Sequence, residues 1–323
     1  MLVEIGMEKL GVYRKPPIDS IKDIPSFVED DYSFRYFQKP QLFHLISLAE
    51  RIGWRDAVAS YQSSSLIRYL TDPQRLLLMP LLSLISNSKI LDLGAGLGSL
   101  SFPIAKRNPS CQVYAFDKTL DGLLLLNIIK EQEKLWNLHI ARADALDIPL
   151  DDSFFDLVLM VGILEWVGNS TVGMKPMEAQ KTALQETYRV LKSGGQLLVG
   201  IENRLGHQFL RGHPDHSGLS YTSLMPRYIA NLYTKIRLGF PYKTYTYSER
   251  GYRKLLTETG FTDVRFFTAI PDYRFPELIL EVNSVKEVLR NKKTSLLTKL
   301  ALRCMPYSLV RLFVPSYLIV AVK

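Results

Sequence analysis

Short apolar runs recur through residues 89–322, and polar, glycine or proline positions bound each of them. Runs of this length are typical of strands that are buried on both faces of a parallel sheet. The first run leads directly into a glycine-rich turn. The pattern predicts seven strands, which lie within 89–100 and at 112–116, 138–143, 155–161, 196–201, 264–270 and 317–322.

Segments with helical periodicity separate these strands. The predicted helices are 99–106, 120–135, a helix that ends at 193–195, and 248–259, which ends at Gly260. Leu184, Tyr188 and Leu191 share one face of the third helix. Strands that alternate with helices in this way predict an α/β fold, namely a Rossmann-like, doubly wound and mostly parallel sheet of seven strands.

The first 88 residues form an N-terminal helical extension to this sheet. Several prolines make 1–39 irregular, so an extended arm is expected there. Residues 40–88 show apolar positions at helical spacing and predict two or three helices. This cap either forms one wall of a substrate pocket or only covers the core. The remaining domain, 89–323, carries an insert at 202–246 and a basic helical segment at 284–314.

Length and composition limit the class of protein. A chain of 323 residues with 47% hydrophobic residues can bury a full core. It contains no apolar run of about 18 residues that would span a membrane. The N-terminus lacks the long apolar region of a secretory signal, and the two cysteines show no metal-type spacing. A cytoplasmic protein is therefore expected.

Positive charge is concentrated near the C-terminus. Residues 283–323 hold eight Lys or Arg residues and one acid, while the chain as a whole has a net charge of +8. A basic segment of this kind favours an anionic partner, such as the inner face of a membrane, which 284–314 would contact peripherally. The alternative is an ordinary solvated helix face.

The glycine-rich turn carries the strongest chemical signal. Gly94, Gly96 and Gly98 follow the first strand at alternate positions, so the backbone can approach a ligand there. Dinucleotide-binding turns need a different spacing, Gly-x-Gly-x-x-Gly. Asp92 also precedes the glycines. A carboxylate is unfavourable beside a pyrophosphate and favourable beside the amino group of a cationic sulfonium cofactor.

The run Leu-Asp-Leu-Gly-Ala-Gly-Leu-Gly at 91–98 resembles motif I of the class I S-adenosylmethionine-dependent methyltransferases. The resemblance implies that the last strand joins the sheet antiparallel and that S-adenosylmethionine is the cofactor. Asp117, 19 residues after Gly98, would accept hydrogen bonds from the ribose hydroxyls, or else serve only as a helix N-cap. Asp144 and the backbone after it would meet the adenine edge. The expected cofactor-binding residues are Asp92, Gly94, Ala95, Gly96, Gly98, Asp117, Lys118, Asp144, Ala145 and Val161.

The absence of one motif narrows the range of possible methyl acceptors. In the same family, enzymes that methylate base amines carry an Asn/Asp-Pro-Pro-aromatic box at the end of the fourth strand. This chain has Val-Gly-Ile-Leu at 161–164 instead, and 162–167 is the region that closes over the cofactor and faces the substrate. The sequence also holds no recognisable nucleic-acid-binding module, so a nucleic-acid partner is not expected.

The insert places His207, His213 and His216 close together in sequence, after the end of the fifth strand. Three interpretations are open. His216, paired with Asp215 or Glu202, could remove a proton from a substrate hydroxyl, which makes these three residues the candidate catalytic group. Histidines and carboxylates could bind a divalent metal ion, although no metal site is assigned. The same residues could only hold an irregular loop together.

The insert resembles one found in bacterial methyltransferase-domain proteins associated with surface polysaccharides. That resemblance favours O-methylation of a small molecule, a sugar or a lipid-linked glycan. The alternatives are an NAD(P)-dependent oxidoreductase of Rossmann type and a partner subunit that binds the cofactor without catalysis. The oligomeric state is not predicted.

Overall fold

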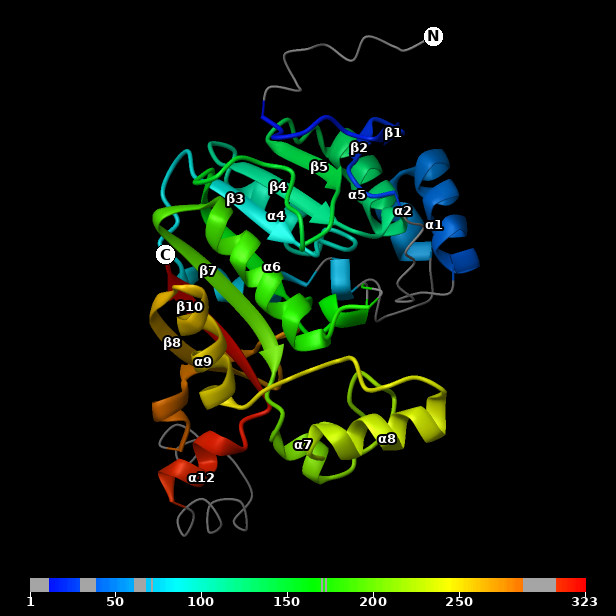
Figure 1. Cartoon of the computed structure of the whole chain (residues 1–323). Helices are drawn as coiled ribbons and strands as arrows, with labels where there is room; N and C mark the ends of the chain where they lie inside the picture. The colour runs from blue at the N-terminus through cyan, green and yellow to red at the C-terminus, as the bar shows by residue number, and fades with distance from the viewer. Residues whose placement is uncertain are drawn as a thin grey trace.

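The computed structural model describes residues 12–29, 39–60, 68–70, 72–169, 171, 173–286 and 306–323. Within these residues one ten-stranded sheet runs through the molecule (Figure 1). The strands are β1 Asp19–Ile21, β2 Ile24–Ser26, β3 Lys89–Leu93, β4 Gln112–Asp117, β5 Leu138–Arg142, β6 Phe155–Val161, β7 Leu191–Glu202, β8 Thr262–Ile270, β9 Leu278–Glu281 and β10 Ser316–Val322. Their order in the sheet is β1-β2-β5-β4-β3-β6-β7-β10-β8-β9.

All seven predicted strands are present. The neighbouring strands β5, β4, β3, β6 and β7 are parallel to one another. Strand β10 lies between β7 and β8 and is antiparallel to both. The prediction of seven strands was wrong in number, because short strands extend both edges. At one edge the β1–β2 hairpin occupies part of the predicted arm and joins β5 through Ser26 and Arg142. At the other edge β9 pairs with β8.

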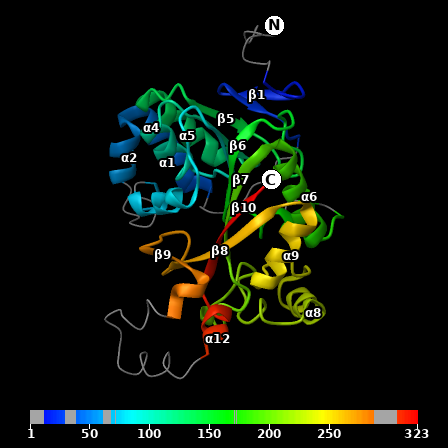
Figure 2. The ribbon, with the colours of Figure 1, turned by 90° about the vertical axis from the view of Figure 1, so that its left-hand side faces the viewer.

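Helices cover both faces of the sheet, which Figure 2 shows nearly edge-on. The helices are α1 Lys39–Ile52, α2 Trp54–Ser60, α4 Ser101–Arg107, α5 Leu120–Glu133, α6 Pro176–Val190, α7 His207–Leu210, α8 Arg227–Leu238, α9 Glu249–Thr259 and α12 Tyr307–Leu312, with 3₁₀ turns η2 Pro73–Leu81, η3 Val167–Asn169 and η4 Val282–Ser284. One face carries α1, α2, α4 and α5, and the other carries α6 and α9.

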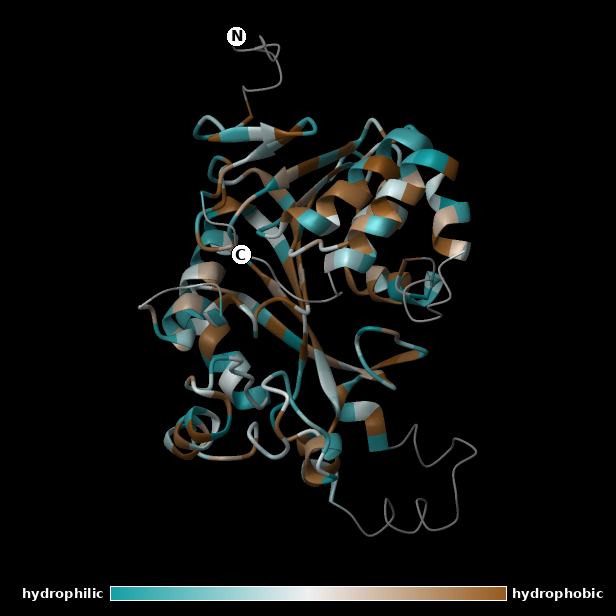
Figure 3. Ribbon diagram, turned by 90° about the vertical axis from the view of Figure 1, so that its right-hand side faces the viewer, coloured by the Kyte–Doolittle hydropathy of each residue, from teal (hydrophilic) through white to brown (hydrophobic). Residues whose placement is uncertain are grey.

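Two hydrophobic layers hold these helices to the sheet. Leu125 and Ile129 of α5 are buried with the strand residues on one face, and Leu184 of α6 and Leu255 of α9 are buried on the other. Figure 3 shows the hydrophobic residues concentrated along the strands between the helical layers. The sheet is therefore buried on both faces, as the continuous apolar runs predict.

The described part of 40–88 contains α1, α2 and the 3₁₀ turn η2, which agrees with the two or three helices predicted there. The predicted insert is more ordered than expected. The insert 202–246 is not a structureless connection, because α7 and the 12-residue helix α8 lie in it. Of the basic segment 284–314, residues 287–305 lie outside the described part of the chain. Among the described residues no helix is long and apolar enough to cross a membrane.

Candidate functional site

The turn between β3 and α4 exposes backbone to a cavity. Gly94 and Gly96 have φ angles of 80° and 54°, which side-chain-bearing residues rarely adopt. The Gly94 and Ala95 N–H groups donate to the Phe116 carbonyl of β4, at 2.7 and 3.0 Å. A Cβ atom built on Gly96 meets nothing within 4 Å, so this residue presents bare backbone to open space.

Two other glycines allow close packing behind the turn. A Cβ atom on Gly98 would lie 2.2 Å from the Leu126 side chain of α5. A Cβ atom on Gly122, at the start of α5, would lie 2.5 Å from the Gly96 carbonyl oxygen. Gly98 thus allows the turn to pack against Leu126. Gly122, which the sequence did not indicate, allows α5 to approach the turn.

The cavity has a volume of about 320 Å³ and lies at the carboxyl ends of β3, β4, β5 and β6. This is where open α/β sheets bind ligands. Seven of the ten predicted cofactor-binding residues line it. They are Gly94, Gly96, Asp117, Lys118, Asp144, Ala145 and Val161. Asp92, Ala95 and Gly98 are not among its lining residues.

Asp92 is the main correction to the predicted site. Its side chain is directed to the sheet face that α4 covers, where it accepts hydrogen bonds from the Ser101 N–H at 3.1 Å and the Ser101 hydroxyl at 2.5 Å. Because only 3% of Asp92 is exposed, burial raises its pKa to about 6. Asp92 therefore anchors the start of α4 and has no direct contact with the cavity.

Asp117 links the turn to the cavity. Its Oδ2 accepts from the Gly96 N–H at 2.8 Å, and its Oδ1 accepts from the N–H and the hydroxyl of Thr119, the residue that precedes α5. Burial raises the pKa of Asp117, against the lowering effect of these hydrogen bonds. A carboxylate oxygen accepts more than one donor, so the structural role leaves capacity to bind a ligand.

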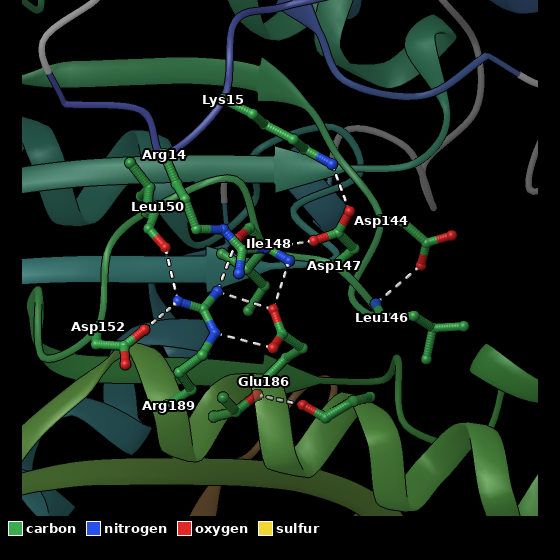
Figure 4. Close-up of polar contacts among 12 residues, drawn as sticks. Arg14, Lys15, Asp144, Leu146, Asp147, Ile148, Leu150, Asp152, Glu186 and Arg189 are labelled. Carbon is green, nitrogen blue, oxygen red and sulfur yellow. Dashed lines mark hydrogen bonds and ion pairs between the residues drawn. The ribbon is translucent and has the colours of Figure 1, made fainter.

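Asp144 lies in a loop that α6 holds in place. Its Oδ2 is 2.8 Å from Lys118 Nζ, and its Oδ1 accepts from the Leu146 N–H at 3.0 Å. Arg189 of α6 donates to the carbonyl oxygens of Ile148 and Leu150, both at 2.8 Å (Figure 4). These contacts fix the segment that presents Asp144 and Ala145 to the cavity.

Three polar side chains meet beside the cavity, and we call Glu165, Glu202 and His216 the acid–histidine cluster. His216 Nε2 lies 2.7 Å from Glu202 Oε2 and 3.5 Å from Glu165 Oε1. Glu202 ends β7, and Glu165 follows the neighbouring parallel strand β6. Glu165 was missed from the sequence, although it lies four residues after a predicted strand, in the region expected to face the substrate.

The cluster lies next to the cavity wall. Trp166 lines the cavity, and its ring centroid is 4.6 Å from that of His216. Arg274, which also lines the cavity, is close enough for its charge to lower the pKa of Glu202. The Tyr273 hydroxyl, from the same loop as Arg274, lies 3.4 Å from both Glu165 Oε1 and Glu202 Oε1 and can donate its one proton to either.

Burial and pairing change the protonation of the cluster. Burial raises the pKa of Glu165 to about 7, and the neighbouring Glu202 charge adds to this effect. Burial alone would lower the pKa of His216, but its hydrogen bond to Glu202 and the Glu202 charge raise it to about 9. Burial likewise opposes the charge on Glu202, yet the bond from His216 lowers its pKa. His216 and Glu202 thus form an ion pair at neutral pH.

The other predicted residues of the insert lie outside the cluster. Asp215 accepts from Ser217 through Oδ1 and from the Tyr242 hydroxyl through Oδ2, at 2.8 Å for Tyr242, so it organises the loop and does not pair with His216. His207 lies against the Phe313 carbonyl, and His213 is exposed. The three histidines do not form one group.

Residues 84–217 match the family model described as a methyltransferase domain, so this part of the chain is a methyltransferase domain. Among solved structures, phosphoethanolamine N-methyltransferase 2 of Haemonchus contortus in complex with S-adenosyl-L-methionine shares the fold, with a TM-score of 0.50 and 17% identity over 86% of this chain and 60% of that one.

Two bacterial relatives match parts of the chain. The ubiquinone/menaquinone biosynthesis C-methyltransferase UbiE of Neisseria gonorrhoeae is 32% identical over 147 residues, which are 44% of this chain and 54% of that protein. An uncharacterized protein of Haemophilus influenzae is 30% identical over 114 residues, which are 35% of this chain and 42% of that protein. The chain thus covers about half the length of these relatives.

Proposed function

We propose that the protein transfers a methyl group from S-adenosylmethionine to a hydroxyl oxygen of its acceptor. The observation that carries this proposal is the cavity, because its lining combines the bare Gly96 backbone and the carboxylates of Asp117 and Asp144 with Trp166, which packs against His216 of the acid–histidine cluster. The family match over 84–217 supports the same cofactor.

The chain's own residues suit this cofactor. The backbone at Gly94 and Gly96 would lie against its amino-acid portion, Asp117 would accept from the ribose hydroxyls, and Asp144 with the Ala145 N–H would meet the adenine edge. When bound, the cofactor supplies a methyl group already activated on sulfonium. The protein must then mainly align the acceptor and exclude water.

A hydroxyl acceptor must lose its proton as the methyl group is transferred. His216 Nε2 is already engaged by Glu202 at 2.7 Å. Glu165 Oε2, in contrast, is buried and has no hydrogen-bond partner among the described residues. We therefore assign Glu165 as the proton acceptor. The Glu202 charge raises its affinity for a proton, and His216 lies 3.5 Å from its Oε1 atom.

A small molecule, a sugar or a lipid-linked glycan is the acceptor that we propose. The cavity wall beyond the glycine turn includes Tyr69, Trp166 and Phe275, together with Arg274. Aromatic faces beside a few polar groups suit a ring that carries hydroxyls. The named relatives methylate carbon and nitrogen respectively, so the test must identify the acceptor atom.

An anionic membrane surface is the further partner in this proposal, at the inner face where a lipid-linked acceptor would lie. Residues 287–305 of the predicted basic segment lie outside the described chain, so that segment stays a prediction. The described residues offer a second surface, the α8 face, which we define as Tyr228, Ile229, Leu232, Ile236 and Phe240. No Asp or Glu occurs between residues 216 and 248, whereas Lys235 and Arg237 are exposed on α8.

Calorimetry and labelling test the methyl-transfer proposal. The protein is expected to bind S-adenosylmethionine and S-adenosylhomocysteine but not NAD. Asp117→Asn and Asp144→Asn should each weaken binding about 10-fold to 100-fold, because each removes a charged hydrogen-bond acceptor. Melting temperatures check that the variants fold, and Glu258→Gln, on the surface of α9, is the matched control.

The acceptor is found by incubating the protein with ¹³C-methyl-labelled cofactor and fractionated cell extract. A labelled methoxyl carbon in a glycan, lipid or small-molecule fraction supports the proposal. Label on nitrogen or carbon would overturn O-methylation while leaving the cofactor assignment intact. An NAD isotherm without any heat from S-adenosylmethionine would overturn both.

A further inference from the structure

The acid–histidine cluster has the composition and spacing of a metal site. One ligand atom from each of Glu165, Glu202 and His216 lies within 4.8 Å of the others. Ligand atoms bound at about 2.1 Å to one ion are about 3.0 to 3.4 Å apart when they subtend right or tetrahedral angles. Side-chain movements of about 1 Å would therefore bring all three onto one ion.

Glu165 provides an independent sign of a missing partner. Its side chain is 0% exposed, and its Oε2 atom has no hydrogen-bond partner among the described residues. An unsatisfied buried carboxylate oxygen is costly, so native proteins normally supply a donor, a water molecule or a cation. This oxygen belongs to the same carboxylate that lies 3.5 Å from His216 Nε2.

The charges of the cluster also favour a cation. Two ionised carboxylates beside a neutral imidazole would leave two negative charges in a buried place. A divalent ion with a neutral imidazole would balance both carboxylates. Arg274 supplies positive charge at the edge of the cluster, but among the described residues it makes no hydrogen bond to the Glu165 Oε2 atom.

We propose that Glu165, Glu202 and His216 bind a divalent transition-metal ion. Two carboxylates and an imidazole suit Mn²⁺, Co²⁺ or Zn²⁺ better than Ca²⁺ or Mg²⁺, because nitrogen ligands favour transition metals. Three protein ligands leave coordination positions open for an exogenous oxygen. The inference that these residues bind a metal ion does not depend on the proposed function. Only the catalytic role of the ion rests on the proposed function. There the ion would polarise the acceptor hydroxyl, and the proton would pass to the Glu165 carboxylate oxygen that does not bind the ion.

Direct metal titration of the full chain tests the site. The chelator-treated protein is titrated with Co²⁺ and followed by calorimetry and by visible absorption, which reports the ligands around the ion. We expect one bound ion per chain and release of a proton from His216 on binding. Because loss of an outer-shell partner costs 10-fold to 100-fold in affinity, loss of a ligand in Glu165→Gln or His216→Gln should cost at least about 100-fold.

His213→Gln is the matched control, since His213 is an exposed histidine of the same insert, and melting temperatures confirm folding. No binding to the folded chain, or binding that Glu165→Gln and His216→Gln leave unchanged, overturns the inference. Methyl transfer that persists with a chelator and without bound metal would leave the proposed function standing. Absence of cofactor binding alongside intact Co²⁺ binding would overturn the proposed function alone.

Discussion

The buried carboxylate of Asp92 couples the stability of the β3–α4 region to pH. An aspartate in an unfolded chain has a pKa near 3.9, whereas burial raises that of Asp92 to about 6. Between about pH 4 and pH 6 the folded state therefore binds a proton that the unfolded state has lost. The contribution of Asp92 to the free energy of unfolding is most favourable below this window and falls as pH rises through it.

Asp92→Asn is expected to remove this pH dependence. The amide oxygen can still accept a hydrogen bond from Ser101, but it carries no charge. At pH 7.5 the variant should have a free energy of unfolding higher by about 1–3 kcal/mol, since two pKa units correspond to roughly 3 kcal/mol at most. At pH 4 the gain should largely disappear. Urea unfolding of the cofactor-free protein at several pH values measures both quantities.

The exposed residue Asp151 provides the comparison for this variant. Asp151→Asn should leave the free energy of unfolding close to that of the parent throughout the pH range, because its carboxylate is in water in both states. A stability loss in Asp92→Asn at pH 7.5, larger than at pH 4, would contradict the assignment of a destabilising buried charge.

At the scale of single residues, the sequence placed two carboxylates at the cavity. Asp117 was indicated by its spacing from the glycine turn and Asp144 by the family resemblance, and both line the cavity, while their contact with a cofactor stays a prediction. Asp92 was misplaced, since strand alternation together with the position of α4 decides which face its side chain occupies. To predict that Glu165 lies beside Glu202, one must know that β6 and β7 are neighbours in the sheet, and no local sequence pattern shows this.

The β3–α4 turn combines two kinds of glycine, and a matched pair of substitutions separates them. Gly96 and Gly98 both have positive φ, so alanine at either position costs about 1–2 kcal/mol of stability. Gly98→Ala also forces Cβ against Leu126 and should cost a further 1–3 kcal/mol or so. Gly96→Ala should weaken cofactor binding more than it lowers stability, because its Cβ enters the cavity.

Denaturant unfolding and cofactor calorimetry on the two variants check this division. The expected pattern is a larger stability loss in Gly98→Ala and, once the folded fraction is accounted for, a larger affinity loss in Gly96→Ala. Equal stability losses would mean that Leu126 moves aside at little cost. An unchanged affinity in Gly96→Ala would show that the cofactor does not approach this part of the turn.

The elements that were predicted and those that were missed differ in what they bury. The seven predicted strands are buried in the sheet and therefore have continuous apolar runs, which the sequence shows directly. Helix α8 was missed because it buries only small or polar residues, Ala230 and Thr234, and exposes its large apolar ones. The β1–β2 hairpin was missed because each strand has three residues, too few for a pattern to show.

At the scale of the whole molecule, α7, α8 and α12 lie together at the end opposite the β1–β2 hairpin (Figure 1). The carboxyl end of β7, and with it Glu202, is directed toward this end. His207 of α7 donates its N–H to the Phe313 carbonyl after α12. The proposed site and the α8 face thus belong to the same half of the molecule, where an acceptor held in a lipid surface would approach.

The α8 face should bind anionic lipid vesicles. Tyr228, Leu232 and Ile236 recur every fourth residue and are 74%, 62% and 73% exposed, and Lys235 and Arg237 flank them. A helix with exposed apolar and basic residues suits the interface of an anionic membrane. Replacing Leu232 and Ile236 together by Glu removes about 3 kcal/mol or more of apolar burial, so vesicle binding should fall about 100-fold.

Co-sedimentation with vesicles of phosphatidylcholine alone and with added phosphatidylserine measures this binding at low and high salt. Ile85→Glu is the control, because Ile85 is 67% exposed and lies outside the α8 face, and it should bind like the parent. Binding should require the anionic lipid and weaken with salt, since screening shortens the reach of Lys235 and Arg237. Equal binding to both vesicle types would contradict the requirement for anionic lipid, and full binding by the double Glu variant would mean that the α8 face does not contact lipid.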